Sequence, residues 1–244
     1  MQGQEKIHIG TSGWHYEHWR GPFYPDDLAK SGFLKYYADR FHTVEINNSF
    51  YQLPRGETVR QWKEAVPSDF IFSLKASRYI THMKKLKDPG NTLPALLRVA
   101  DALGRQGGPI LFQLPPRLRL NGKRFQQFLE ALPSGRRYAF EFRDTTWFDP
   151  GVYDALTKGG AAFCIYELAG QHSPKEVTAD FVYIRLHGPA GAYQGQYDRN
   201  ALEGWAGALS AWTRQGKEVF CYFDNDQAGY AAQDALRLQE MIRG

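Results

Sequence analysis

The sequence predicts a closed (β/α)8 barrel of the TIM type, and three observations carry this prediction. Short runs rich in β-branched and aromatic residues alternate with amphipathic stretches, which is the pattern of βα units around a parallel sheet. Eight such runs occur, and 244 residues is close to the usual length of one eight-stranded barrel. No Gly-x-Gly-x-x-Gly follows the first run, which disfavours an open dinucleotide-binding sheet. We therefore expect one domain spanning residues 1–244.

The eight expected strands are short apolar runs separated by Gly, Pro and polar segments. They are Ile7–Ser12, Thr43–Asn48, Phe70–Ala76, Ile110–Leu114, Tyr138–Arg143, Ala162–Glu167, Phe181–His187 and Val219–Asp224. The expected helices between them carry apolar residues at helical spacing. They are Asp26–Arg40, Glu57–Val66, Leu93–Leu103, Phe125–Leu132, Val152–Lys158, Leu202–Arg214 and Ala228–Ile242. No clear helix is expected between the sixth and seventh strands.

Composition places the chain among ordinary globular proteins. Hydrophobic residues make up 43% and charged residues 23%, which is enough apolar material for a large core. The longest apolar runs, such as 110–112, are too short to cross a membrane, and the polar start Met1–Lys6 lacks the apolar region of a signal peptide. We expect a cytoplasmic protein with no membrane partner. Cys164 and Cys221 lie in apolar runs and are expected to be buried and unpaired.

Residue parity within the strands predicts where the charged side chains point. Successive side chains of a barrel strand alternate between the helix-covered outside and the interior. In five strands an apolar set alternates with a polar set, and we expect the apolar set to face the helices. The inward polar residues are then Glu45, Asn47, Ser73, Lys75, Gln113, Glu141, Arg143, Tyr183, Arg185 and His187. Because they lie near the C-terminal ends of their strands, we expect them at the barrel mouth, where enzymes of this fold do their chemistry.

Two interpretations of these inward charges are open. They could form a structural network of ion pairs that plugs the top of the barrel. Burying several charges for stability alone is a poor strategy, however, because apolar residues of similar volume often stabilise a protein as well or better. We therefore favour a functional pocket over a purely structural plug.

Several motifs along the chain resemble those of one protein family. They are Gly10-Thr-Ser-Gly-Trp14, Val44-Glu-Ile-Asn47 with Ser49-Phe-Tyr51, Lys75 with Ile80-Thr-His82, Leu111-Phe-Gln-Leu-Pro115, Glu141-Phe-Arg143 with Trp147, Arg185-Leu-His-Gly188 and Tyr222-Phe-Asp-Asn-Asp226. In combination they are similar to the YecE-like family, domain of unknown function 72, over essentially the whole chain. The resemblance implies a TIM-like barrel, in agreement with the strand count, and it implies no reaction. Asp224 stands where the family more often has Asn.

Glu45 and Glu141 are candidate catalytic carboxylates. Two carboxyl groups can serve as general acid and general base when their surroundings push their pKa values apart. A retaining glycosidase would hold them about 5–5.5 Å apart, and Trp14, Trp19 and Trp147 could then stack on a sugar. The alternative is that each glutamate simply pairs with a neighbouring cation.

The residues at the end of strand seven predict an anion site. Arg185 is followed by His187 and by a glycine-rich loop that begins at Gly188, at the place where barrels often bind phosphate. Arg143 would add a second guanidinium for bidentate contact with a phosphate or carboxylate. Lys75 could be a base or a Schiff-base nucleophile, but we favour an electrostatic anchor.

No dedicated metal or cofactor site is predicted. His15 and His18 lack a third and a fourth ligand at diagnostic spacing. Asp224 and Asp226 could hold Mg²⁺ with a phosphorylated substrate, but Asp-Asn-Asp before a helix is equally suited to capping that helix, and we favour capping. No known cofactor motif occurs in the sequence.

We therefore expect a metal-independent enzyme that acts by acid–base chemistry on a small phosphate- or carboxylate-bearing substrate, as a hydrolase or a lyase. The expected catalytic residues are Glu45, Glu141, Lys75 and His187, and the expected substrate-binding residues are Trp14, Trp19, Asn47, Gln113, Arg143, Trp147, Arg185, Gly188 and Asn225. One alternative is a barrel that binds or processes nucleic acid through the lysines of His82–Lys87, and another is a glycosidase that uses Glu45 and Glu141. The sequence leaves the substrate, the reaction and the oligomeric state open.

Overall fold

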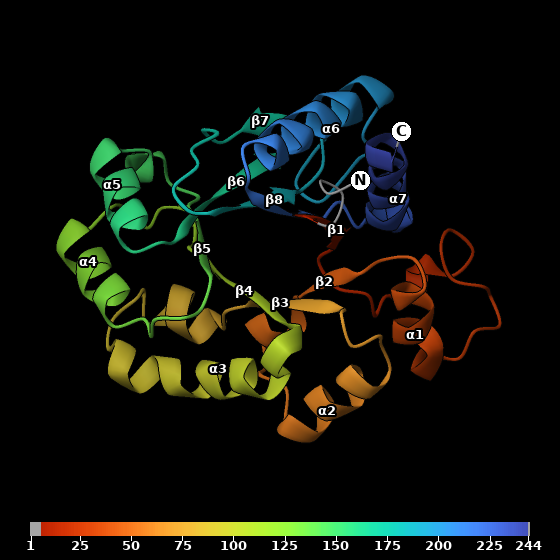
Figure 1. Ribbon diagram of the computed structural model, residues 1–244, viewed down its shortest axis with the longest axis horizontal. Helices are drawn as coiled ribbons and strands as arrows, with labels where there is room; N and C mark the ends of the chain where they lie inside the picture. Colours follow the sequence, from red (N-terminus) through yellow and green to blue (C-terminus); the bar gives the residue numbers. More distant parts are fainter. Residues whose placement is uncertain (1–5, 244) are drawn as a thin grey trace.

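The computed structural model describes residues 6–243 and confirms the predicted barrel (Figure 1). Its strands are β1 (Ile7–Thr11), β2 (Thr43–Ile46), β3 (Ile71–Lys75), β4 (Gly107–Gln113), β5 (Tyr138–Glu141), β6 (Ala162–Leu168), β7 (Gln171–His172), β8 (Phe181–Leu186) and β9 (Glu218–Phe223). Its α-helices are α1 (Phe33–Ala38), α2 (Gly56–Glu64), α3 (Pro89–Leu103), α4 (Gly122–Glu130), α5 (Pro150–Lys158), α6 (Arg199–Arg214) and α7 (Tyr230–Arg243). The eight longer strands run parallel in the order β1-β9-β8-β6-β5-β4-β3-β2, and β7 is a short antiparallel partner of β6.

The barrel closes between β1 and β2 with little backbone pairing. Ser12, just after β1, forms an isolated parallel bridge with Glu45 of β2. A side chain of α1 fills the rest of the seam, because the Tyr37 hydroxyl accepts the Thr11 N–H at 2.9 Å and donates to the Thr43 carbonyl at 3.0 Å. The closure therefore depends on one tyrosine as well as on the strands.

Two separate apolar clusters confirm the predicted alternation of side chains. The larger cluster lies between strands and helices and includes Phe112 and Ile184. The smaller cluster fills the barrel interior and includes Leu111 and Tyr183, the chain neighbours of those two residues. Both cysteines are buried and free, as expected. The interior layer also holds a small hydroxyl network, in which Tyr222 hydrogen bonds with Thr43 and Ser73, and the charged side chains lie at the C-terminal end of the barrel.

The first helix is shorter than the expected helix 26–40. Residues 25–29 form turns and irregular backbone, Lys30–Gly32 is a short 3-10 helix, and α1 begins only at Phe33. The cause is a ring contact across these turns, because Tyr24 stacks on Phe33 with 4.1 Å between the ring centroids. The two rings bring the ends of the segment together, which a straight helix over the same residues would prevent.

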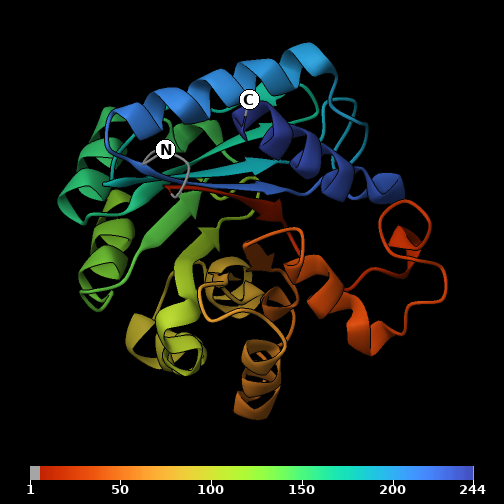
Figure 2. The same cartoon turned by 45° about the vertical axis from the view of Figure 1, so that its right-hand side comes forward.

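The outer layer lacks one helix, as the sequence predicted. Residues 169–180, between β6 and β8, contain the β7 hairpin and no helix. The last two helices, drawn in blue in Figure 2, cover the strands at the chain's two ends, because α6 packs on β9 and α7 packs on β1 and β9. None of the helices within residues 6–243 is long and apolar enough to cross a membrane.

Candidate active site

Arg185 lies at the centre of a buried charged cluster at the C-terminal end of the barrel. The side chain extends from β8 and is completely buried. Its guanidinium donates to Glu45 Oε1 at 2.8 Å, to Glu141 Oε2 at 2.8 Å and to Asp224 Oδ2 at 2.9 Å. Burial lowers the pKa of Arg185, but the three carboxylates outweigh burial and raise it well above the usual value. Arg185 therefore holds three carboxylates together and has no exposed surface.

Glu45 uses both carboxylate oxygens within this cluster. Oε1 accepts hydrogen bonds from Arg185 and from the Ser12 hydroxyl, and Oε2 accepts one from the Tyr183 hydroxyl at 2.7 Å. The side chain is completely buried. Two of its three hydrogen-bond donors, Arg185 and Tyr183, come from β8, and the third, Ser12, directly follows β1, so Glu45 of β2 links these strands at the mouth.

Glu141 is bound as tightly on the other side of Arg185. Its Oε1 accepts a hydrogen bond from Arg143 Nε and lies 3.3 Å from His187 Nε2. Burial raises the pKa of Glu141, but the charges of Arg143 and Arg185 outweigh burial and hold the pKa well below its usual range. Glu141 is therefore a stable carboxylate that does not hold a proton near neutral pH.

The hydrogen bonds of His187 define its tautomer. Arg143 NH2 lies 2.8 Å from His187 Nε2, and a guanidinium nitrogen can only donate, so Nε2 carries the lone pair. The proton then sits on Nδ1, which donates to Asp224 Oδ2 at 3.0 Å. His187 is completely buried and links Arg143 to Asp224. Its geometry is that of a positioning residue for both.

Arg143 lies at the outer edge of the cluster, where the cluster reaches the surface of the mouth. Its side chain is 8% exposed, and its guanidinium lies over the Tyr166 ring, 4.9 Å from the centroid. Tyr193, from the loop after β8, meets the His187 ring edge to face with 5.5 Å between centroids. These two tyrosines form the border of the cluster on its β6 and β8 side.

Lys75 differs from the other cations of the mouth because it has no carboxylate partner. It ends β3 and is 6% exposed. Its Nζ donates to Asn47 Oδ1 at 3.0 Å and lies 4.7 Å from the centre of the Phe50 ring, and no carboxylate oxygen in residues 6–243 lies within 4.0 Å. Burial, together with the charge of Arg185, lowers the pKa of Lys75 to about 8. Lys75 can therefore exchange a proton near neutral pH.

A pocket of about 350 Å³ opens beside Asn47, the partner of Lys75. It lies between the first two strand-to-helix loops and is lined by Gly13, Trp14, His15, Tyr16, Asn47, Asn48 and Tyr51. The Tyr16 hydroxyl donates to the Ser12 carbonyl at 2.8 Å. Burial, with the charges of Asp224 and Asp226, raises the pKa of Tyr16, and a hydrogen bond with Asn47 opposes this rise. Asn47 thus joins the pocket to the charged cluster.

Backbone strain is concentrated at the same end of the barrel. Non-glycine residues with positive φ within residues 6–243 are Lys85, Leu86, Asp88, Arg117, Ala169, Tyr193 and Ala228. Every one of them lies in a loop that follows the C-terminal end of a strand. Such conformations are costly and cluster at functional sites, where the surrounding structure maintains them. The strain marks the mouth independently of its charges.

Comparison with known proteins places this barrel in a family. Residues 8–244 match the family described as "Protein of unknown function DUF72". The chain belongs to the DUF72 family. It is 25% identical to the UPF0759 protein YunF of Bacillus subtilis (strain 168), over 97% of this chain and 94% of that protein. The resemblance seen in the sequence motifs is therefore confirmed.

Solved structures of DUF72 proteins share the barrel. A DUF72 protein of Thermotoga maritima MSB8 superposes with a TM-score of 0.88 at 28% identity, covering 98% of this chain and 99% of that one. A DUF72 protein of Enterococcus faecalis V583 superposes with a TM-score of 0.82 at 20% identity, covering 98% of this chain and 96% of that one, and shows the likeness of fold alone.

Two of the tryptophans expected to contact substrate belong to the packing of this DUF72 barrel instead. Trp19 is completely buried among aromatic rings, and its indole nitrogen donates to Asp226. Trp147 is 3% exposed, stacks on Phe142 and donates to the Leu118 carbonyl at 2.6 Å. Neither indole is open to the mouth in this structure, so the expected role of closing the site stays a prediction without support from their contacts.

Three other residues expected to bind substrate lie at or near the cluster, and they differ in how far they are buried. Gln113 ends β4 beside Glu141 and is 8% exposed. Asn225 is completely buried and donates to the Gly195 carbonyl at 2.9 Å. Gly188 has φ +107°, and a Cβ there would lie 2.2 Å from the Gln194 carbonyl oxygen, so only glycine fits. Asn225 and Gly188 shape the loop after β8.

The expectation that the two aspartates after β9 cap a helix is wrong. Asp224 binds Arg185 and His187, and the Asp226 side chain caps no helix N-terminus. Asp226 pairs instead with His18, at 3.2 Å. Over the part of the chain that the structure describes, no group of three or more His, Cys, Asp or Glu side chains is arranged to hold a metal ion.

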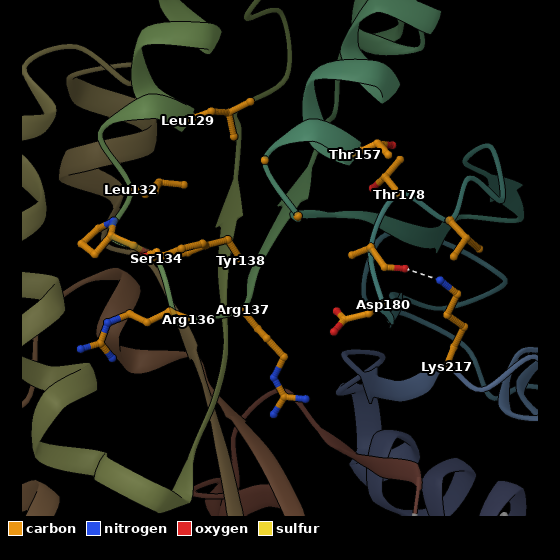
Figure 3. Close-up of a pocket in the computed structure, with 16 residues that line it drawn as sticks. Leu129, Leu132, Ser134, Arg136, Arg137, Tyr138, Thr157, Thr178, Asp180 and Lys217 are labelled. Atoms are coloured by element: carbon orange, nitrogen blue, oxygen red, sulfur yellow. Dashed lines mark hydrogen bonds between the residues drawn. The ribbon is translucent and has the colours of Figure 1, made fainter.

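A larger cavity, of about 680 Å³, opens at the opposite end of the barrel (Figure 3). It lies where β5, β8 and β9 begin, and its cations already have partners within the protein. Lys217 donates to the Ala179 carbonyl at 2.7 Å, Arg137 pairs with Glu218, and Arg136 pairs with an aspartate of α3. None of the predicted site residues lines it.

Sequence reasoning missed several side chains of the mouth. Tyr166 could have been found, since it follows Cys164 by two positions in the same strand and so points inward by parity. Tyr193 and Tyr51 lie on irregular loops and carry no such signal. Ser12 was assigned to the first strand without a role, yet its hydroxyl bonds Glu45.

Proposed function

We propose that this DUF72 barrel is an enzyme that binds a small phosphate- or carboxylate-bearing substrate at its mouth and moves a proton through Lys75. The observation that supports this most is the buried Lys75 ammonium, which has no carboxylate within 4.0 Å in residues 6–243. A buried charge is costly unless it is paired. An anionic group of the substrate would supply the missing partner.

The other charges of the cluster act as a scaffold for this chemistry. Arg185 binds Glu45, Glu141 and Asp224 through its two terminal nitrogens, so these four groups form a fixed arrangement of charges beneath the mouth. Preorganised charge of this kind stabilises a transition state without reorganising during the reaction. Arg143 uses Nε and NH2 within the cluster, and its NH1 makes no hydrogen bond to another described residue. That NH1 is a second donor for the anion.

Lys75 suits proton transfer better than the two glutamates that the sequence suggested. A general acid or base works best when its pKa lies near the working pH, and the Lys75 pKa is lowered to about 8. Glu45 and Glu141 are completely buried and hydrogen bonded through both oxygens. For the same reason a glycosidase mechanism with these two carboxyl groups has little support, since neither is open to a sugar.

A thermal-shift screen of phosphorylated and carboxylated metabolites tests the proposal. A ligand that binds only the native state raises the melting temperature of the protein, and the rise grows with the ratio of ligand concentration to dissociation constant. We expect at least one small anion to stabilise the wild type and to lose its effect in Lys75→Met and Arg143→Met. The control is Arg136→Met, which removes a cation at the far end of the barrel. If no anion acts, or if Lys75→Met responds like the wild type, the proposal is wrong.

A second candidate function is nucleic-acid binding, favoured by the rim segment after β3. Lys85 and Lys87 are exposed there, next to Met83, which is 63% exposed. Lysines on a rim attract phosphates, and such binding weakens steeply as salt rises. An oligonucleotide whose affinity falls with salt, and falls further in Lys85→Ala/Lys87→Ala, would support this candidate over the small-substrate enzyme.

A further inference from the structure

The pocket lined by Trp14, Tyr16, Asn47 and Tyr51 adjoins the proposed catalytic lysine through one shared residue. Asn47 lines the pocket and accepts the hydrogen bond of Lys75 Nζ at 3.0 Å. We propose that this pocket is a subsite for a flat aromatic or heteroaromatic ring, joined to the anionic group that Lys75 binds. This inference rests on the proposed function and names the part of the substrate that the charged cluster does not recognise.

The seven lining residues include Trp14, Tyr16 and Tyr51, and neighbouring residues hold the first two rings in place. Trp14 is 6% exposed and packs edge to face against Trp62, with 5.1 Å between centroids. Tyr16 is fixed by the hydrogen bond of its hydroxyl to the Ser12 carbonyl. Ring faces held in place in this way favour stacking by another ring, because little side-chain freedom is lost on binding.

Tyr51 is the exposed wall of the pocket. Its side chain is 71% exposed, although a large aromatic residue usually gains by burying its ring. The other exposed large apolar residues within residues 6–243 are Tyr79, Met83 and Tyr193, and none of these lines the pocket. A ligand ring seated against Tyr51 would cover the apolar surface that the protein leaves open.

Two side-chain amides at the pocket can hydrogen bond to polar atoms at the edge of a ligand ring. The side-chain oxygen of Asn47 accepts the hydrogen bond of Lys75, so the NH2 group of Asn47 faces away from the lysine. The Asn47 side chain also lies within hydrogen-bonding distance of the Tyr16 hydroxyl. Asn48 adds a second, exposed amide. A sugar ring carries a hydroxyl on nearly every carbon and needs many polar partners. Aromatic walls with two amides instead suit a flat ring that has few hydrogen-bonding atoms.

Four small probes separate the ring from the anion. Inorganic phosphate carries the anion alone, benzamide carries a flat ring alone, phenyl phosphate carries both, and cyclohexyl phosphate replaces the flat ring by a saturated one. Their affinities for the intact protein can be measured by titration calorimetry. We expect phenyl phosphate to bind about tenfold more tightly than inorganic phosphate, which is the usual gain from one stacked ring. Cyclohexyl phosphate should gain much less.

Tyr51→Ala is the decisive variant, because it truncates an exposed side chain and leaves the core intact. It should bring the affinity for phenyl phosphate close to that for inorganic phosphate and leave the affinity for inorganic phosphate unchanged. The matched control is Tyr79→Ala, a tyrosine of 45% exposure on the same rim but outside the pocket, which should keep the full preference.

Two results would overturn the ring subsite. Phenyl phosphate could bind no better than phosphate or cyclohexyl phosphate, or its preference could survive in Tyr51→Ala. Failure of the proposed function looks different from either. Benzamide would then bind in a Tyr51-dependent manner, while none of the three phosphate compounds would bind more weakly to Lys75→Met than to the wild type. That outcome supports the ring pocket and removes the anion site.

Discussion

The Lys75 ammonium donates to the Asn47 amide oxygen at 3.0 Å and is the cation of the mouth that no carboxylate in residues 6–243 approaches within 4.0 Å. Arg143 and Arg185, by contrast, are each bound to Glu141. The protein thus neutralises two of its three mouth cations internally and leaves one for exchange with a ligand or with solvent protons.

Replacing Lys75 by methionine should change the pH dependence of stability. Burial lowers the Lys75 pKa from 10.5 to about 8, so between these values the unfolded chain binds more protons than the native protein. Wild-type stability therefore gains about 3 kcal/mol from pH 7 to pH 11 through this group, and Lys75→Met lacks the gain. Urea unfolding at both pH values measures the difference. Parallel curves for the two proteins would show that the lysine is not perturbed.

Glu141→Gln should destabilise the protein strongly. The change removes the carboxylate that Arg143 pairs with and leaves Arg185 with two of its three carboxylates, and breaking one partner of a buried ion pair costs about 3–5 kcal/mol. Asp101→Asn, which breaks the surface pair with Arg136, is the control and should cost less than about 1 kcal/mol. Chemical denaturation gives both values. Equal effects would mean that the buried cluster contributes no more than a surface pair.

Acid should remove the contribution of Glu141. Its folded pKa lies well below the usual value because the charges of Arg143 and Arg185 outweigh the effect of burial. The stability it provides is therefore complete above the unfolded pKa of about 4.3 and is lost as pH falls through the folded pKa. The difference in unfolding free energy between wild type and Glu141→Gln should shrink below about pH 4. A difference that stays constant down to pH 2 would contradict the assignment.

His187 should carry its proton on Nδ1. Asp224 accepts from Nδ1, and Arg143 donates to Nε2. The ¹⁵N chemical shifts of the imidazole distinguish a protonated nitrogen from a bare one, so NMR of labelled protein reads the tautomer directly. His187→Asn, whose amide can replace the Nδ1 donor, should be more stable than His187→Ala. A protonated Nε2 would instead mean that His187 donates to Glu141, which lies 3.3 Å away.

The alternation of residues along the strands predicted which way the side chains point but not how deeply they are buried. Glu45, Lys75, Glu141 and Arg185 point inward as expected, because alternation along a strand is a property of the local backbone. Whether such a side chain reaches the surface depends on what lies above it. Arg185 is covered by residues from three other strands, and no pattern along β8 records those partners.

The loops explain most of what the sequence did not predict. Trp19 and Trp147 follow strands, as many site residues do, but contacts with distant rings and carbonyls bury them. Tyr193 and Tyr51 come close to the cluster or to its pocket through turns of irregular backbone. The position of such residues depends on long-range packing. Loops lack the periodic pattern of helices and strands, so a single sequence does not show these contacts.

In the proposed function, Lys75 is a proton carrier whose missing counter-charge is supplied by a bound anion. NMR of protein labelled with ¹³C at lysine Cε, with the signal assigned by Lys75→Arg, follows the titration of this one group. We expect a midpoint near pH 8 in the free protein and a higher midpoint when an anion such as phosphate is added, since a bound anion favours the ammonium form. A midpoint above pH 10 that no phosphate or carboxylate compound shifts would contradict the account.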